Sequence, residues 1–224
     1  MTCKFCDHLC QRAGKQRNGA QKLYCTRCDK YQQQGYIYLA CRAGTIEMVQ
    51  SLTCESVGIR SISRVLGIAA NTVMEKIRSI ASTIERPIVG KDQPCFEVDE
   101  LWTYIGRKAN EHWVAYALDK ERKVIDFVVG KRTVSTLRHL IDRLLASGVK
   151  QIRTDRLTHY QKLIPKDRHR RSTYGINHIE RKNLTLRTHL KRLSRRTICF
   201  SRKLTMLENC LRIYFWRGRT AYDK

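Results

Sequence analysis

Acidic residues are scarce in this chain of 224 residues. Only 20 Asp and Glu stand against 44 Lys and Arg, which leaves a formal net charge of +24. So large an excess of positive charge indicates a polyanionic partner, and nucleic acid is the first candidate. The excess is marked between residues 156 and 224, where 19 basic residues accompany four acidic ones. We therefore expect this C-terminal part of the chain to make many of the contacts with phosphate.

Long apolar runs, an amphipathic membrane anchor and a signal peptide are also lacking. These absences argue against a membrane partner and predict a reducing compartment, in which the ten cysteines are not expected to form disulfides. The hydrophobic content of 42% is sufficient for a core. The length suits one medium domain with one or two small modules.

Four of the cysteines form two closely spaced pairs near the N-terminus, Cys3 with Cys6 and Cys25 with Cys28. Two C-x2-C pairs separated by 18 residues can supply four thiolates to one tetrahedral zinc ion. So short a segment buries too little apolar surface to fold unaided, and the metal would supply the missing free energy. Residues 1–42 are therefore predicted to be a zinc ribbon with a structural Zn²⁺. Its four thiolates would leave no position for water.

Three short helices are predicted between residues 43 and 86. Their expected N-caps are Thr45, Ser61 and Asn71, and Gly58 and Gly67 separate them. Two helices joined by a turn that contains Gly are typical of a helix-turn-helix DNA-binding domain, in which the last helix enters the DNA groove. An ordinary three-helix packing unit is the alternative. The outward side chains of the last helix, which are the DNA-binding candidates, are Asn71, Thr72, Lys76 and Arg78.

Pro87 and Pro94 mark residues 87–94 as a linker to a third region, residues 95–215. Apolar patterns in this region predict strands at 95–104, 113–118, 123–129 and 149–154, and a helix at 133–146. Three strands, a helix, a further strand and more helices predict an α/β domain with a mixed sheet. Residues 216–224 carry no usable motif and are expected to form a tail.

Three acidic residues are placed where catalytic carboxylates would lie. Asp99 lies in the first predicted strand, Asp155 ends the fourth, and Glu180 begins a basic helical stretch. Two aspartates on neighbouring strands and a glutamate on a nearby helix can hold two divalent metal ions. Such ions activate one oxygen and stabilise the leaving oxygen in phosphoryl transfer on DNA. For Glu180, a surface acid in a first helical turn is the alternative.

The helical stretch that carries Glu180 has an apolar stripe at helical spacing, made by Ile179, Leu186, Leu190 and Leu193. His178 would either position a phosphate or water, or lie on the surface as an ordinary histidine. Basic side chains on this stretch and just after it are further DNA-binding candidates. They are Arg181, Lys182, Arg187, Lys191, Arg195 and Arg196.

Other acidic residues of the third region are set aside. Glu97 and Glu100 share a strand with Asp99 and are expected to point to its opposite face. Asp126, in the third predicted strand, is the best rival to the three chosen carboxylates.

Taken together, these motifs resemble those of the insertion-sequence-one family of bacterial transposases. The resemblance rests on the two cysteine pairs, the helix-turn-helix and segments 98–102, 154–155, 179–184, 186–190 and 193–201. It covers nearly the whole chain and implies a ribonuclease H-like domain with an Asp-Asp-Glu triad at Asp99, Asp155 and Glu180. Arg156 departs from the family, in which Gly often follows the second aspartate, but the departure removes no ligand.

The resemblance also implies a catalytic Mg²⁺, or Mn²⁺ in its place, and double-stranded DNA, both element ends and target, as the partner. The expected activity is binding of terminal inverted repeats, followed by 3′-end cleavage and strand transfer of the mobile element. Synapsis of two DNA ends implies a homo-oligomer, and a bacterial cytoplasmic, nucleoid-associated location is expected. A DNA-binding regulator with an inactive third domain and a metal-dependent DNA nuclease are the alternatives. The intact acidic trio favours the transposase.

Overall fold

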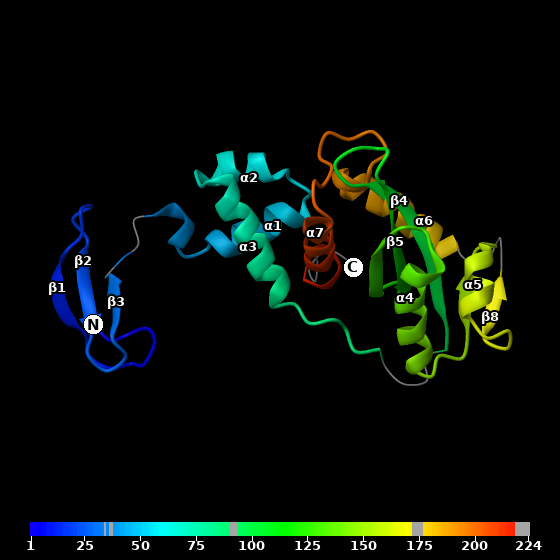
Figure 1. Cartoon of the computed structure of the whole chain (residues 1–224), viewed down its shortest axis with the longest axis horizontal. Coiled ribbons are helices and arrows are strands. Elements are labelled where there is room, and N and C mark those ends of the chain that lie inside the picture. Colours follow the sequence, from blue (N-terminus) through cyan, green and yellow to red (C-terminus); the bar gives the residue numbers. More distant parts are fainter. Residues whose placement is uncertain (34, 36–37, 90–93, 172–176, 218–224) are drawn as a thin grey trace.

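A computed structural model of the chain describes residues 1–33, 35, 38–89, 94–171 and 177–217. Its N-terminal part is a small antiparallel sheet in the order β1-β2-β3. The strands are β1 Gln11–Lys15, β2 Gln21–Cys25 and β3 Lys30–Gln33. The turn between β1 and β2 needs a left-handed backbone, which Gly19 supplies at φ +79°. Figure 1 shows this sheet set apart from the rest of the chain.

Three helices follow a short 3-10 turn at Leu39–Cys41. They are α1 Thr45–Cys54, α2 Ile59–Leu66 and α3 Ala70–Ser82. The inward residues of α3 are the apolar ones expected from its periodicity, and Val73, Ile77 and Ile80 are all buried.

The predicted N-caps of these three helices are wrong. Each helix begins earlier, after a residue that has no capping side chain, and the N-cap positions are taken by Gly44, Gly58 and Ala69. The hydroxyl and amide side chains expected to cap lie inside the helices instead, at Thr45, Ser61 and Asn71. Packing of the apolar faces therefore sets these helix starts, and capping propensity does not.

A five-stranded mixed sheet forms the second half of the chain, in the order β6-β5-β4-β7-β8. The first three strands pair antiparallel, whereas β7 and β8 run parallel to β4. The strands are β4 Phe96–Tyr104, β5 Glu111–Leu118, β6 Val124–Gly130, β7 Ile152–Thr154 and β8 His169–Arg171. The expected mixed α/β architecture is confirmed.

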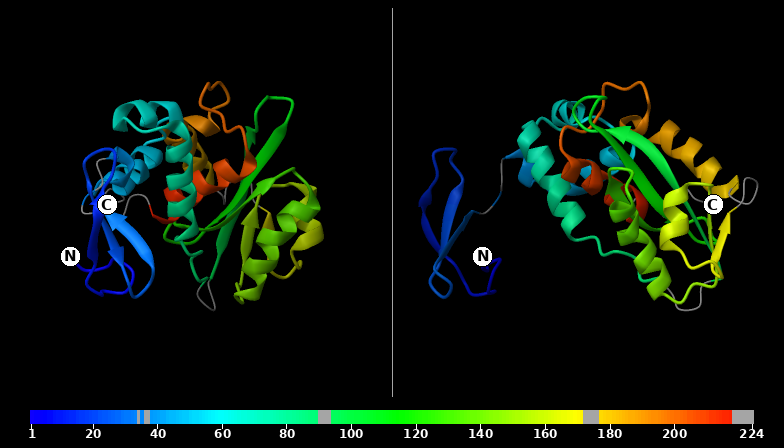
Figure 2. Two further views of the ribbon diagram at one scale, coloured as in Figure 1. Left: turned by 60° about the vertical axis from the view of Figure 1, so that its left-hand side comes forward. Right: turned by 45° about the vertical axis from the view of Figure 1, so that its right-hand side comes forward.

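Helices cover both faces of this sheet. On one face Val98 of β4 belongs to the same buried cluster as Leu140 of α4 and Tyr160 of α5. On the other face Leu101 and Tyr116 pack with α6, with the 3-10 turn η2 and with α7. Figure 2 shows the same arrangement in two further views. The helices are α4 Val134–Ala146, α5 Thr158–Leu163, α6 Asn177–His189, η2 Lys191–Leu193 and α7 Leu204–Trp216.

The C-terminal helix α7 joins the two halves of the molecule. One side of it, including Met206 and Ile213, completes the buried core of α1, α2 and α3. The other side, including Leu207 and Leu211, packs on the large sheet. Figure 1 accordingly shows α7 between the three helices and the sheet. Because one helix serves both cores, the three helices are held against the sheet and do not depend on the connecting segment.

The predicted linker and tail fall partly outside the described residues, at 90–93 and 218–224. Within the described part, α7 extends to Trp216, the first residue expected in the tail. No described helix is both long and apolar enough to cross a lipid bilayer.

Candidate active site

Two of the predicted carboxylates meet where β7 ends. The parallel register pairs Val98 of β4 with Thr154 of β7, so the next residues, Asp99 and Asp155, lie side by side. Carboxylate oxygens of Asp99, Asp155 and Glu100 lie within 4.8 Å of one another. Three acidic groups so close together repel each other, and a cation among them would relieve the repulsion.

Glu100 is the unexpected member of this group. Since β7 ends at Thr154, β4 has no neighbour on that side beyond Val98, and the Glu100 carboxylate reaches the aspartates there. Glu100 leaves β4 on the face opposite Asp99, as expected, beside Tyr160 of α5. Its exclusion from the acidic group was nevertheless wrong. Its side chain is 1% exposed, and its Oε2 accepts a hydrogen bond from Arg132 at 3.2 Å. Its other oxygen, Oε1, is buried. Burial raises the pKa of Glu100, although the Tyr160 hydroxyl and Arg132 oppose the rise.

Burial raises the pKa of Asp99 to about 6. Two hydrogen bonds oppose this effect: the Glu100 N–H donates to Oδ1 at 2.7 Å, and the Asn183 amide donates to Oδ2 at 2.6 Å. The charges of Asp155 and Glu180 raise the pKa further. The buried hydroxyl of Tyr116 fixes Asn183 in turn, because it donates to the amide oxygen at 2.8 Å. Asp99 is thus held in one orientation, in surroundings that favour a bound cation.

The third predicted carboxylate, Glu180, lies on α6 one turn before Asn183. Residues three apart share one face of a helix, so Glu180 is on the side of α6 that faces Asp99. Its charge contributes to the raised pKa of Asp99. However, Glu180 is exposed and does not belong to the group of oxygens within 4.8 Å.

Glu97 anchors the start of α6 against β4. Its Oε2 accepts a hydrogen bond from the Ile179 N–H at 3.0 Å, and its Oε1 lies 3.0 Å from Nδ1 of His178. Glu97 therefore points to the same face as Asp99, two residues away, and its predicted orientation is wrong. The contact with Glu97 occupies Nδ1 of His178, so this ring nitrogen serves the packing of α6 on β4. The apolar stripe of α6 and η2 is buried as predicted.

Asp126, the rival carboxylate, has a structural role. It is 1% exposed and pairs with two arginines, Arg86 at 3.3 Å and Arg143 at shorter range. These two arginines balance the negative charge of Asp126. They lie on segments other than those that carry Asp99, Asp155 and Glu180.

The four paired cysteines lie together in the small N-terminal sheet. All four Sγ atoms are within 4.8 Å of one another, and the closest pairs, Cys3–Cys28 and Cys6–Cys25, are 3.5 Å apart. A disulfide would require about 2 Å, whereas the edges of a tetrahedral zinc–thiolate site measure about 3.8 Å. Burial and the neighbouring thiols raise the pKa of Cys28 to about 12, since adjacent thiolates repel. The donor set and its spacing thus fit zinc.

The predicted DNA-binding residues fall into separate groups. On α3, Asn71 is exposed, and the other three candidates are partly buried. Arg187 on α6 is partly buried and donates a hydrogen bond to the Leu193 carbonyl at 3.2 Å. This side chain therefore stabilises the packing of α6 against η2. By contrast, Arg195 and Arg196 are exposed beside two tryptophans.

Besides Glu100, four residues of the site were not anticipated from sequence: Tyr116, Arg132, Asn183 and Glu97 as an anchor. Only Asn183 had a local signal, since it lies one helical turn after Glu180. Tyr116 and Arg132 come from other strands and loops, and no spacing rule connects them to the aspartates. Arg132 pairs with Glu100 and lies 4.0 Å from Asp155, so it links two members of the acidic group.

Comparison with known proteins shows clear relatives of this region. A family model described as IS1 transposase matches residues 93–218. The insertion element iso-IS1n protein InsB of Shigella dysenteriae is 40% identical over 116 residues, which cover 51% of this chain and 88% of that protein. The insertion element IS1 protein InsB of Shigella flexneri is 36% identical over 121 residues, covering 54% and 92%. The IS1 1 protein InsB of Escherichia coli (strain K12) is 35% identical over 147 residues, covering 64% and 86%.

Among solved structures, similarity is found to a chain of the simian T-cell lymphotropic virus intasome in complex with PP2A regulatory subunit B56 gamma. The sequence identity is 15% and the TM-score is 0.36, with 77% of this chain and 64% of that chain covered.

Proposed function

The chain belongs to the IS1 transposase family, and on this premise we propose that it cleaves the 3′ ends of its mobile element and joins them to target DNA with the help of divalent metal ions. One observation carries the proposal. Asp99 and Asp155 lie side by side at the end of β7, and α6 turns Glu180 towards them.

The second half of the chain, residues 95–216, would then be a ribonuclease H-like catalytic domain. The order of its strands, three antiparallel and two parallel, supports this assignment. The two catalytic aspartates would then be Asp99 on β4 and Asp155 just after β7, and the parallel pairing of these strands supports this assignment. The helix that supplies the glutamate must lie across the same face, and Glu97 holds α6 there.

Asp99, Asp155 and Glu180 would hold Mg²⁺ or Mn²⁺. Carboxylate oxygens are the hard ligands that these ions prefer. Burial, and to a smaller extent the charges of Asp155 and Glu180, raise the pKa of Asp99, and a bound cation would stabilise its ionised form. Bound metal would activate the attacking oxygen and stabilise the leaving one. The chain's own residues prepare the site: Asn183 orients Asp99, and the Arg132 guanidinium, held by Glu100, suits a phosphate oxygen.

The N-terminal parts would bind the element ends. Residues 1–42 would be a zinc ribbon with Zn²⁺ on the four cysteines, and residues 43–86 a helix-turn-helix that presents Asn71 and its neighbours on α3 to the terminal inverted repeats. The basic residues of α6 and the segment after it would hold DNA near the acids. Because both ends of the element must be joined together, the working form would be a homo-oligomer.

A strand-transfer assay tests this proposal. Zinc-loaded full-length chain would be incubated with Mg²⁺ and a duplex carrying the inverted repeats that flank its own gene, with a scrambled duplex as control. The variants compared would be Asp99→Asn, Glu180→Gln and Glu100→Gln, with Glu121→Gln in an exposed hairpin as the matched control. We expect joined products from wild type and Glu121→Gln. Asp99→Asn and Glu180→Gln should lose at least about a thousandfold in rate, because ligands to the metal are removed.

Each other outcome would indicate a different third ligand or a different activity. Activity that survives Glu180→Gln but not Glu100→Gln would make Glu100 the third ligand. Binding of the repeats without cleavage by any protein would favour a regulator. Nicking without joining would favour a nuclease.

A further inference from the structure

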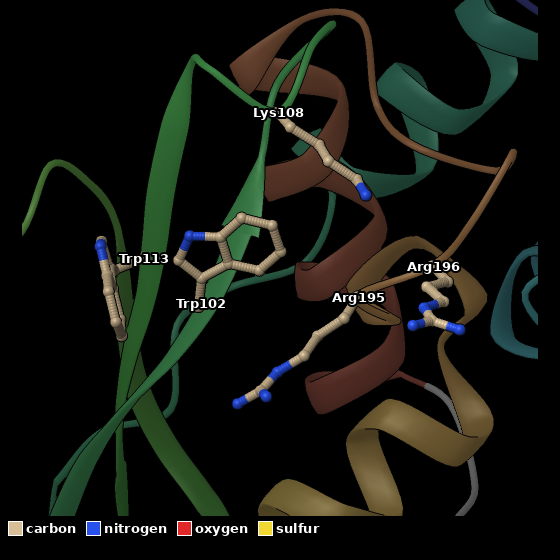
Figure 3. Close-up of a pocket in the computed structure, with 5 residues that line it drawn as sticks. All are labelled: Trp102, Lys108, Trp113, Arg195 and Arg196. Atoms are coloured by element: carbon tan, nitrogen blue, oxygen red, sulfur yellow. The ribbon is translucent and has the colours of Figure 1, made fainter.

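A groove lined by two tryptophans and three cations lies near the acidic site. Trp102 of β4 and Trp113 of β5 face each other directly across the antiparallel pair. With Lys108, Arg195 and Arg196 they line an open groove of about 430 Å³. Figure 3 shows Trp102 between Trp113 and the three basic side chains.

The basic wall of this groove is fixed to the sheet. The Tyr104 hydroxyl donates to the Thr197 carbonyl at 3.0 Å, and the Gly106 N–H donates to the Ser201 carbonyl at 2.9 Å. These bonds tie the segment that follows η2 to the end of β4 on the C-terminal side of the two arginines. On the other side, Ser194 Oγ donates to the Arg187 carbonyl at 3.0 Å. Arg195 and Arg196 therefore project from a segment with defined ends.

Trp102 and Trp113, which form the floor of the groove, are also held in place, and Trp113 is connected to the acidic group through Arg132. The Trp102 Nε1 donates to Glu111 at 3.3 Å. One face of Trp113 is covered by Arg132, whose guanidinium carbon lies 4.4 Å from the ring centroid. Arg132 in turn pairs with Glu100 and approaches Asp155. Arg132 therefore lies between Trp113 and the carboxylates of Glu100 and Asp155.

We propose that this groove holds an unpaired nucleotide of the DNA strand, with its base stacked on Trp102 and its phosphates on Lys108, Arg195 and Arg196. The inference rests on the proposed function and adds to it a site for the distorted DNA end. A planar ligand suits the two indole rings. The three cations that line the groove outnumber the Glu111 carboxylate hydrogen-bonded to Trp102, so they select an anion. Bases within a duplex are already stacked on their neighbours, so only an unpaired base can present its face to Trp102.

The test measures binding alone and needs no cleavage. Full-length zinc-loaded protein, without Mg²⁺, would be titrated with labelled blunt inverted-repeat duplex and with the same duplex carrying a short single-stranded extension. Wild type should bind the extended duplex about tenfold more tightly, the value expected for one stacked base. Trp102→Ala should lose this preference and still bind the blunt duplex normally. Trp102→Tyr, which keeps an aromatic face, should retain most of it.

Two further variants separate stacking from charge and from general damage. Trp216→Phe, in α7 and outside the groove, should keep the full preference. The double variant Arg195→Gln/Arg196→Gln should weaken binding of the extended duplex and lower its salt dependence by about one ion per lost phosphate contact. The circular dichroism spectrum of each variant reports whether it is folded.

The result that overturns the inference is a folded Trp102→Ala protein that keeps the wild-type preference, or a wild type that has none. Neither result bears on the proposed transposase function, which the strand-transfer assay tests separately. Conversely, a preference that depends on Trp102 in a protein without strand transfer would support the groove and refute the transposase activity.

Discussion

Replacing Asp99 by Asn should stabilise the metal-free protein, although it removes a proposed catalytic group. Burial raises the pKa of Asp99 from 3.8 to about 6, so the folded protein binds this proton more tightly than the unfolded chain does. The ionised carboxylate therefore destabilises the fold. This penalty is complete above about pH 6, shrinks as the pH falls, and is gone below about 3.8. The neutral amide of Asn escapes the penalty at every pH.

The magnitude follows from the same values. A pKa rise from 3.8 to about 6 corresponds to about 3 kcal/mol. Because Asp99 is only partly buried and water screens its charge, we expect between about 1 and 3 kcal/mol at pH 8. The single carbonyl oxygen of Asn can accept from only one of the two present donors, Asn183 or the Glu100 N–H, so one hydrogen bond is lost and the gain is expected in the lower part of this range. At pH 5 the advantage of the variant should be about half of its value at pH 8.

Urea unfolding at pH 8 and pH 5, without Mg²⁺ and without chelator, measures both numbers. Asp126→Asn is the matched control, because it replaces another buried aspartate of the same sheet. Asp126 is buried and paired with Arg86 and Arg143, so Asn at this position loses the charge that both guanidinium groups bind and should cost about 2 kcal/mol. Opposite signs for the two variants are expected. An Asp99→Asn protein no more stable than wild type at pH 8, or equally stabilised at both pH values, would refute the reasoning.

Two further predictions concern the support of the metal sites. Cys25→Ser should abolish zinc binding and unfold the N-terminal sheet, because zinc supplies the folding free energy of this sheet. Elemental analysis measures the bound zinc, and proteolysis of the N-terminal segment measures its unfolding. Cys41→Ser is the control, because Cys41 is exposed and lies outside the four-cysteine cluster. Wild type that contains no zinc and resists proteolysis equally well would contradict this. Asn183→Ala should weaken Mn²⁺ binding by about 10- to 100-fold, because Asp99 loses the side chain that orients it. Electron paramagnetic resonance of Mn²⁺ measures this affinity. The exposed Thr188→Ala on the same helix should bind Mn²⁺ as wild type does, and an unchanged affinity in Asn183→Ala would remove Asn183 from the site.

Much of the local structure could be predicted because it depends on neighbours in sequence. The spacing of Cys3, Cys6, Cys25 and Cys28 indicates a four-thiolate cluster, which the fold assembles. Thr133 was expected to begin a helix, and its hydroxyl accepts from the Thr136 N–H at 3.2 Å. Other helix starts were predicted wrongly, since α1, α2 and α3 obtain their stability from a shared core and do not need a capping side chain.

The candidate site divides in the same way. Periodicity states the direction in which a side chain leaves its own strand or helix. It therefore placed Asp99 on a strand, Asp155 at a strand end and the stripe of α6 in the core. It cannot state where a neighbouring strand ends, and Glu100 joins the aspartates only because β7 stops at Thr154.

By itself, then, the sequence determined the ligand types, their approximate elements, the basic surface and the family. Tertiary structure alone decided which residues meet: Asn183 with Asp99, and Glu97 with the start of α6. The physical reason is that these contacts join residues about 80 to 90 positions apart, whose encounter depends on strand order and helix packing. Local propensities and spacings carry no information about such partners.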